Sequence, residues 1–365
     1  VLDGVDPDAL TVFPVFQLTP TVDPDWGYLI AVDATGTIRW YHDIGHLSLL
    51  FSITDDGTVL YSKAAEILME HHPMQGPINR WEAASSTLDT VHHEAHKLNG
   101  DTWAILSSEH ERISGFPDEA QYDIIGDVLA EVQGDGTVIW EASVLDFIDP
   151  TQVNTEDMHA TFWEQWPYDM LDSPKDWSHG NAMVWNESRK EWLASLRNID
   201  QLAAFSREDG SLMWSFGPGG SFVLEGDSRW FSRQHAPVWT SDNTLLIYDN
   251  GLQRADADED DFPFTRVVEY ALDFETYVAT ETWSYVGSIP YLAPIVGQVT
   301  PIEDDAYLIT DGAILGGTVT HEGQEVSHFS ARLVELDRST TPKVRSELIV
   351  GTPLDLSQPG YVVYR

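Results

Sequence analysis

Short apolar runs separated by polar turns recur along the whole chain. One module is an apolar strand, a turn that contains glycine with aspartate or threonine, and a second strand that closes on tryptophan. Its copies end at Trp40, Trp140 and Trp214, and a degenerate copy ends at Trp283. Glycine supplies the positive φ of a tight hairpin turn, and the flanking β-branched and aromatic residues favour strands. Each copy therefore predicts a β-hairpin.

A second module alternates with the first and also predicts a strand, a turn and a strand. Joining one copy of each module gives a four-stranded antiparallel unit, which is the blade of a β-propeller. Residues 1–365 are therefore expected to form a single all-β domain, a six-bladed β-propeller with four-stranded antiparallel blades. Five copies of the second module start near Leu49, His93, His179, His235 and Gly297, and segment 12–33 supplies a sixth with a variant turn.

The spacing between modules is uneven, which predicts long insertions between strands. The largest candidates are residues 66–90, 147–178 and 216–234. Long insertions on a propeller gather on one face and build its site. The apolar segments 330–337 and 344–351 and the terminal segment 360–365 are expected to close the ring against the first blade.

The charge of the chain limits its partners. Lys and Arg number 19 against 60 Asp and Glu, which gives a formal net charge of −41. Nucleic acid is therefore excluded as a partner, because phosphate backbones are bound through basic patches. The acidic residues indicate either a solvated coat or a face that recruits a basic partner. No apolar run reaches the length of a membrane span.

Several kinds of site are excluded by the residue types present. The chain has no cysteine, so disulfides, thiolate catalysis and Cys-ligated zinc are ruled out. The run HHEAH fails the zinc-protease motif because Lys97 occupies the place of the second histidine. The chain begins with Val1 and shows no signal-peptide pattern, which fits either a removed leader or a trimmed chain.

Histidines recur at the start of the second module. His93 precedes Thr102 by the same nine residues that separate His235 from Thr244, and His179 opens the corresponding strand. The first strand of each propeller blade lines the central channel, so equivalent positions face one another across it. We therefore expect these three imidazoles to converge near one mouth of the channel.

Arg197 and Asn181 belong to the same predicted blade as His179. Asn181 lies two residues after His179 and so shares its face of the strand. A guanidinium, imidazoles and an amide can all donate hydrogen bonds to a tetrahedral oxyanion, so the cluster predicts an anion site with no metal or cofactor. On a regular strand His92, Glu94 and His96 would face away from His93. The roles of His92, His96 and His159 stay open.

The motifs around these residues resemble the bacterial arylsulfate sulfotransferases, which do not use the nucleotide sulfate donor PAPS. They are HHE at 92–94, DWSHGN at 176–181, SLRN at 195–198 and the run from RQHA to DNG at 233–251, in the order of the family. The resemblance implies that His235 is a nucleophile that becomes sulfated. It also implies that His93, His179 and Arg197 hold the sulfuryl oxygens, with Asn181 as the accompanying amide.

The resemblance further implies a ping-pong transfer from a small-molecule aryl sulfate to a phenol, in a periplasmic or secreted protein. One of His93 and His179 would give a proton to the leaving phenol and later take one from the acceptor. Trp177 and Trp230 are expected to contact the substrate. Trp163, Trp166 and Tyr168 could either complete an aromatic wall or pack within the propeller.

Two alternatives come from other classes. In the first, the histidines bind a divalent metal for lyase or hydrolase chemistry, although an arginine directed at a metal is electrostatically unfavourable. In the second, the propeller is a non-catalytic binding platform. The sequence leaves the donor, the acceptor and the oligomeric state open.

Overall fold

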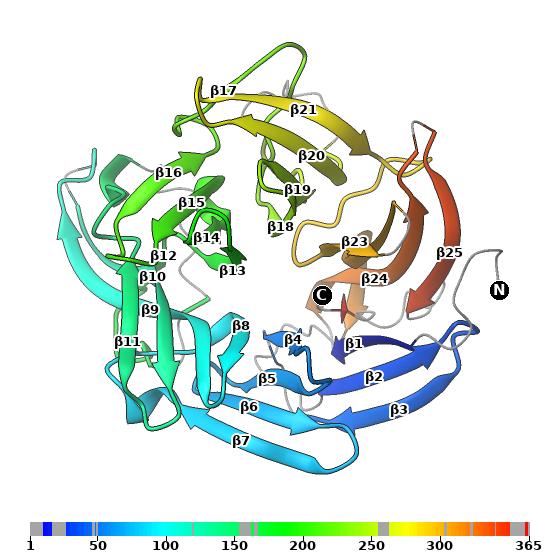
Figure 1. Cartoon of the computed structure of the whole chain (residues 1–365), viewed down its shortest axis with the longest axis horizontal. Helices are drawn as coiled ribbons and strands as arrows, with labels where there is room; N and C mark the ends of the chain where they lie inside the picture. The colour runs from blue at the N-terminus through cyan, green and yellow to red at the C-terminus, as the bar shows by residue number, and fades with distance from the viewer. Residues whose placement is uncertain are drawn as a thin grey trace. The chain divides into compact units, whose positions relative to one another are not determined.

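The chain folds into six antiparallel sheets of four main strands each, which define a six-bladed β-propeller (Figure 1). The predicted fold class is confirmed. The strands divide between two compact units, which are Leu49–Val223 and the combination of Val1–Ser48 with Leu224–Arg365. The computed structural model describes residues 10–16, 27–45, 48, 50–118, 120–152, 162–163, 167–254, 263–302, 305–321, 324–339, 341–350 and 362–363.

The middle unit, Leu49–Val223, contains three consecutive blades. The first is β4 (Phe51–Ile53), β5 (Val59–Lys63), β6 (Ile67–His72) and β7 (Gly76–Glu82). The second is β8 (His92–Asn99), β9 (Thr102–Ser114), β10 (Gln121–Gln133) and β11 (Val138–Ser143), with β12 (Lys175–Asp176) added beside β10. The third is β13 (Gly180–Asn186), β14 (Glu191–Leu196), β15 (Gln201–Ser206) and β16 (Leu212–Phe216).

The terminal unit, Val1–Ser48 with Leu224–Arg365, contains the other three blades. One is β1 (Leu10–Phe16), β2 (Gly27–Asp33) and β3 (Ile38–Asp43), with β26 (Val362–Val363) paired to β1. The next is β18 (His235–Ser241), β19 (Thr244–Asp249), β20 (Arg266–Asp273) and β21 (Val278–Tyr285), with β17 (Val223–Leu224) at its edge. The last is β22 (Gln298–Ile302), β23 (Ala306–His321), β24 (Gln324–Asp337) and β25 (Lys343–Val350).

The two sequence modules form the hairpins that their turns predict. The tryptophan-closed module is the outer hairpin of a blade, as in β10–β11, where Trp140 pairs with Glu131. The same outer hairpin carries a β-bulge in each of the six blades. The C-terminal segment completes the first sheet as expected, because Val363 pairs with Val15 and Val362 pairs with Phe16.

The expectation of an insertion at residues 66–90 is wrong. This segment contains β6, β7 and the short 3-10 turn η1 (Ala83–Ser85), so it supplies the third and fourth strands of a blade. The repeat is hard to see here because Asn79 takes the ladder position, opposite Glu70, that tryptophan takes in the other copies. Apart from Phe216, which ends β16, the described parts of 147–178 and 216–234 contain only η2 (Pro150–Gln152) and the added strands β12 and β17.

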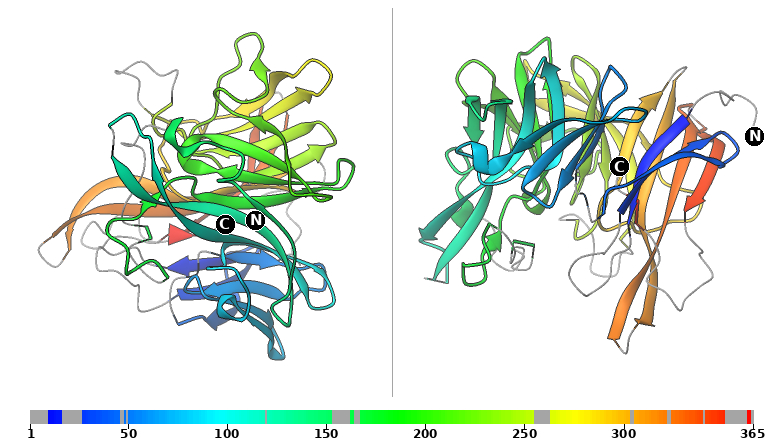
Figure 2. Two further views of the ribbon diagram at one scale, coloured as in Figure 1. Left: turned by 90° about the vertical axis from the view of Figure 1, so that its left-hand side faces the viewer. Right: turned by 90° about the horizontal axis from the view of Figure 1, so that it is seen from below.

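Two hairpins extend beyond the other strands of their own sheets, which the sequence pattern did not predict. They are β9–β10 in the middle unit and β23–β24 in the terminal unit, drawn in teal and orange in the right-hand view of Figure 2.

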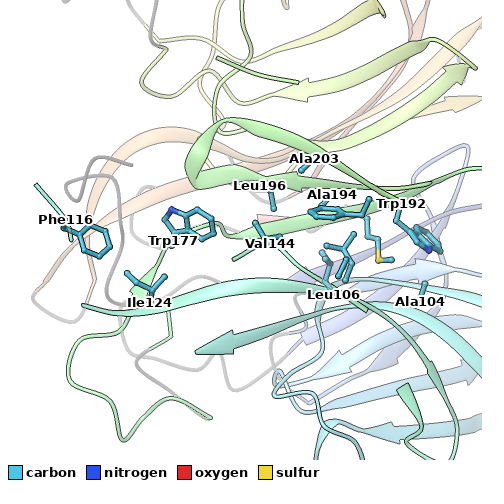
Figure 3. Close-up of a cluster of buried hydrophobic side chains, with 14 residues drawn as sticks. Ala104, Leu106, Phe116, Ile124, Val144, Trp177, Trp192, Ala194, Leu196 and Ala203 are labelled. Carbon is cyan, nitrogen blue, oxygen red and sulfur yellow. The ribbon is translucent and has the colours of Figure 1, made fainter. Parts of the chain in front are cut away.

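The hydrophobic core lies between consecutive blades. One cluster joins Leu60 and Trp81 of one blade to Trp103 and Ile105 of the next. Another joins Ala104 and Leu106 on β9 to Trp192 and Ala194 on β14 and also includes Val144 and Trp177 (Figure 3). Each blade therefore depends on its neighbour to bury its apolar face.

Buried glutamates also connect one blade to the next. Glu70 on β6 accepts a hydrogen bond of 2.6 Å from Lys97 Nζ on β8. Glu131 on β10 accepts bonds of 2.6 and 2.8 Å from the Arg207 guanidinium and one of 2.9 Å from Trp192 Nε1, both in the following blade. Several donors offset the desolvation cost of a buried carboxylate, which an unpaired charge would carry in full.

The turn glycines allow a direct test of blade packing. Gly57 and Gly136 both occupy Asp-Gly-Thr turns with φ of +76° and +92°. A Cβ at Gly57 would meet no atom within 4 Å, whereas one at Gly136 would lie 2.1 Å from the backbone oxygen of Ser85. We predict that Gly57→Ala costs about 1–2 kcal/mol of unfolding free energy from left-handed strain. Gly136→Ala should cost a further ~1–3 kcal/mol from overlap. Equal losses in denaturant titrations would contradict this packing.

Candidate active site

Four of the polar residues predicted for the site, His93, His179, Asn181 and Arg197, lie in the middle unit. The rings of His93 and His179 are 5.0 Å apart. The backbone N–H of Arg197 donates to the backbone oxygen of His179 at 3.1 Å. Asn181 follows on β13, and the side chains of His93, Asn181 and Arg197 are buried. The structure therefore brings the rings of His93 and His179 together and joins the backbone of Arg197 to that of His179.

Both histidines sit on backbone in the left-handed region. The φ of His93 is +55° and that of His179 is +50°. Such a conformation costs a residue with a side chain roughly 1–2 kcal/mol, and it persists only where the surroundings hold it. These two positions are consequently constrained in direction by the backbone as well as by their contacts.

The expectation that His92 faces away from His93 is wrong. A bulge between His92 and Ala95 interrupts the alternation of β8, and the Nδ1 atoms of the two histidines lie 2.8 Å apart. The strand pairing also changes the predicted equivalence between His93 and His235. Leu106 and Tyr248 occupy the same position in their strands, and their partners are His92 and His235. In strand register His235 therefore corresponds to His92, since the bulge in β8 holds more residues than the one in β18.

A buried carboxylate orients His179. Oδ2 of Asp176 lies 2.5 Å from Nδ1 of His179. Trp163 Nε1 donates to Asp176 Oδ1 at 3.1 Å, and Asn198 Nδ2 donates to the Asp176 backbone oxygen at 2.9 Å and to Oδ2 at 3.3 Å. Asn198 Oδ1 in turn accepts a bond of 2.9 Å from the Arg197 guanidinium. A continuous polar chain thus links His179 to Arg197.

A second buried carboxylate, Asp127 on β10, anchors the loop before β13. Its Oδ2 accepts hydrogen bonds of 2.5 Å from Ser178 Oγ and from the backbone N–H of Gly180, on either side of His179. Its Oδ1 lies 3.4 Å from Nε2 of His92. Burial raises the pKa of the Asp127 carboxyl from 3.8 to about 6, and burial lowers the pKa of His92 to about 4.

Sequence reasoning missed Asp127, Asp176 and Asn198. Asp176 and Asn198 stand inside the motifs DWSHGN and SLRN, so the motif itself was the available signal. Asp127 had no such signal, because it belongs to the preceding blade.

The remaining histidine predicted for the site, His235, lies in the terminal unit as the first residue of β18. Its Nδ1 is 2.7 Å from Oδ1 of Asn250. Asn250 Nδ2 donates to the backbone oxygens of Ala293 at 2.7 Å and Val296 at 2.8 Å. Because both hydrogens of the amide are used there, Oδ1 must be the acceptor and His235 Nδ1 the donor. The lone pair of the neutral ring is then on Nε2.

The residue before Asn250 fixes this arrangement. The buried carboxylate of Asp249 accepts bonds of 2.5 Å from Arg254 and 2.8 Å from Arg266, and a third of 3.0 Å from the N–H of Ser232. Thr265 Oγ1 also donates to the backbone oxygen of Asn250 at 2.9 Å. The tautomer of His235 is therefore set by Asn250, and the neighbouring carboxylate of Asp249 is held by two arginines.

The aromatic residues divide between the cluster and the core. The partly exposed ring of Phe162, which the sequence did not single out, lies 4.6 Å from the His179 ring and 5.7 Å from the His93 ring. Trp163 and Tyr168 are buried, and Tyr168 Oη donates to Asp89 at 2.9 Å.

The two tryptophans expected at the substrate have different surroundings, and only Trp177 is a core residue. Trp177 is 0% exposed and packs in the core between blades (Figure 3), and Trp230 is half-buried with its backbone oxygen bonded to Arg254. His96 contacts the backbone oxygen of Met183 through Nε2 at 2.5 Å and stacks on Trp192, which is a structural environment. His159 and Trp166 lie outside the described residues.

Two negative observations concern the described residues alone. No three of their His, Asp or Glu side chains are grouped so as to hold a metal ion. Within that same part of the chain, no helix is long and apolar enough to cross a membrane.

The fold is that of a β-propeller protein, and two of its blades bring the imidazoles of His93 and His179 together. A model of the arylsulfotransferase (ASST) family matches residues 15–349, and the chain belongs to that family. No curated protein matches the sequence at a significant level.

Several solved structures match the chain at low identity. A protein of unknown function from Bacteroides caccae is 11% identical, with a TM-score of 0.52 over 97% of this chain and 100% of that one. The periplasmic gluconolactonase PpgL of Pseudomonas aeruginosa is 9% identical, with a TM-score of 0.46 over 98% and 99% of the two chains. The Cps50 (Swd1) β-propeller domain of Myceliophteria thermophila is 8% identical, with a TM-score of 0.46 over 93% and 92%.

The raised pKa of Asp127 predicts a pH-dependent stability. Between pH 4 and 6 the folded protein binds a proton at Asp127 that the unfolded chain has released, so this carboxyl lowers stability as the pH rises through that window. Asp127→Asn cannot ionise. The wild type should therefore lose up to ~3 kcal/mol of unfolding free energy between pH 4 and pH 7 that the Asp127→Asn variant does not lose. A difference that stays constant with pH in chemical denaturation would refute this.

Proposed function

We propose that this arylsulfotransferase-family protein transfers a sulfuryl group from an aryl sulfate to a phenol through a sulfated His235. The observation that carries the proposal is the fixed tautomer of His235. Asn250 accepts the Nδ1 hydrogen at 2.7 Å, so Nε2 holds the lone pair that a nucleophile needs. Oδ1 of Asn250 would also stabilise the positive charge that the ring acquires when Nε2 bonds to sulfur.

The reaction proceeds in two balanced halves. In the first, Nε2 of His235 attacks sulfur, the sulfur–oxygen bond to the aryl group breaks, and the leaving phenolate takes a proton from a protein acid. In the second, the acceptor phenol gives its proton to the same group, its oxygen attacks sulfur, and the nitrogen–sulfur bond breaks. Neither half needs a nucleotide or a redox partner, and one site serves both.

The remaining residues supply charge and orientation. Arg197, whose guanidinium is oriented by Asn198, and His93 would hold the sulfuryl oxygens together with the amide of Asn181. Donors fixed in advance stabilise developing charge without reorganisation, and losing one typically costs about 10²–10³-fold in rate. The ring of Phe162 beside His93 and His179 offers an apolar surface for the aryl group.

The first test of the proposal is covalent labelling. Brief exposure of the wild type to p-nitrophenyl sulfate should add one sulfuryl group, a gain of about 80 Da by formula mass, as expected for nucleophilic catalysis. His235→Asn should abolish both the label and turnover, because the ring nitrogen that accepts sulfur is gone. Intact-protein mass spectrometry measures the label.

A matched control is His328→Asn, which removes another buried histidine of the terminal unit. This variant should keep the label and the activity. If His235→Asn still gains the added mass, the nucleophile is misassigned. The Asn250→Ala variant should still fold, but it should be labelled more slowly than the wild type. Without Asn250 Oδ1, the hydrogen of the His235 ring can move from Nδ1 to Nε2, the nitrogen that must attack sulfur.

The second test is acceptor dependence. Release of p-nitrophenol should accelerate when a second phenol is supplied, since the phenol clears the sulfated intermediate. The rate should be unchanged by chelator. Equal rates with and without phenol would indicate a sulfatase, and loss of activity on chelation, restored by one metal, would favour the metal-dependent alternative.

A further inference from the structure

We infer that Asp176 is a positioning residue that makes His179, rather than His93, the group that exchanges a proton with the substrate oxygen. The inference rests on the proposed sulfuryl transfer, which by itself leaves the choice between the two histidines open. It concerns residues of the middle unit alone, where the relevant contacts are short and buried.

The surroundings of His179 suit a ring that gains and loses a proton. An ionised carboxylate only accepts hydrogen bonds, so Nδ1 of His179 must donate to Asp176 Oδ2 at 2.5 Å. The exchangeable proton is therefore the one on Nε2. The negative charge of Asp176, which is 1% exposed, is close enough to stabilise the imidazolium that forms when Nε2 is protonated.

Asp176 is itself held in place. Trp163 Nε1 donates to one carboxylate oxygen at 3.1 Å and Asn198 Nδ2 to the other at 3.3 Å. These bonds fix the plane of the carboxylate and so the plane of the His179 ring. A buried aspartate orients the catalytic histidine of serine hydrolases in the same way, through the ring nitrogen that does not meet the substrate.

The surroundings of His93 suit a different role. Its Nδ1 meets another imidazole, Nδ1 of His92, at 2.8 Å. Burial lowers the pKa of His92 to about 4, so His92 is neutral at physiological pH. Nδ1 of His93 therefore meets a neutral imidazole, whereas Nδ1 of His179 meets the carboxylate of Asp176. His93 is thus suited to donate a hydrogen bond to a sulfuryl oxygen.

The proton balance follows. As the bond between sulfur and the aryl oxygen breaks, protonated His179 gives its Nε2 proton to that oxygen, and the ring becomes neutral. Nε2 then takes the phenolic proton of the acceptor as its oxygen attacks sulfur. Asp176 remains a carboxylate throughout and never touches the substrate.

The test uses donors with different leaving groups. p-Nitrophenolate leaves readily without a proton, whereas the phenolate of phenyl sulfate needs one. Asp176→Asn should therefore slow labelling of His235 by less than ~10-fold with p-nitrophenyl sulfate and by ~10²-fold or more with phenyl sulfate, the range of general acid catalysis. Single-turnover mass spectrometry over a series of substituted phenyl sulfates gives the dependence on phenol pKa.

The matched control is Asp123→Asn. Asp123 also bonds a histidine of the middle unit, His110 Nε2 at 2.9 Å, outside the cluster of His93 and His179. This variant should leave the leaving-group dependence at its wild-type value. In a His179→Ala background Asp176→Asn should have little further effect, because its influence passes through His179.

Each outcome decides the inference. A steeper leaving-group dependence for Asp176→Asn alone supports it, and equal slowing across the donor series overturns it. If Asp176→Asn does not fold, Trp163→Phe, which frees one carboxylate oxygen, should steepen the dependence in the same direction. An unchanged dependence in that variant would overturn the inference. A wild type that acquires no label would instead refute the proposed function, so the two failures are distinguishable.

Discussion

The buried carboxylate that meets several hydrogen-bond donors is the interaction on which both the packing and the site depend. A chain with a net charge of −41 must place most of its acids in water, and those that it buries need partners. Glu70 and Glu131 meet donors from the next blade, so their pairing helps to join neighbouring blades. Asp176 and Asp249 meet donors around the candidate catalytic histidines, where the same pairing orients a side chain.

Two buried carboxylates, Asp249 and Asp127, differ in whether a positive charge compensates them. Asp249 has two arginines, so its charge is compensated in the interior. Asp127 has hydroxyl and backbone donors, and burial raises its pKa to about 6. It nevertheless fixes the loop on both sides of His179, which itself has a positive φ. Holding His179 in one orientation therefore lowers the stability of the folded state, as is common for residues at functional sites.

The family and the geometry support the proposed chemistry at different levels. Membership of the arylsulfotransferase family indicates the class of reaction. The hydrogen bonds indicate how the residues would divide the work, with the tautomer of His235 set by a neutral amide and the ring of His179 set by a carboxylate. An amide oxygen adds no charge beside the ring that it orients, whereas a carboxylate places a negative charge beside it. The two histidines therefore have environments that suit opposite roles.

Local properties of the sequence were sufficient for the blades and for the candidate histidines. Turn glycines and closing tryptophans act within a few residues, so the hairpins and the six-bladed fold could be predicted from them. The outer hairpin within residues 66–90 was not predicted, because Asn79 stands where the other copies have the closing tryptophan. The partners of the histidines depend on contacts between distant segments, as when Asp127 reaches Gly180 from the preceding blade. The bulge that turns His92 toward His93 likewise breaks the alternation that a sequence pattern assumes. The sequence thus determined which side chains are available, and the tertiary structure decided which proton each one carries, because hydrogen-bond partners are set by packing between blades.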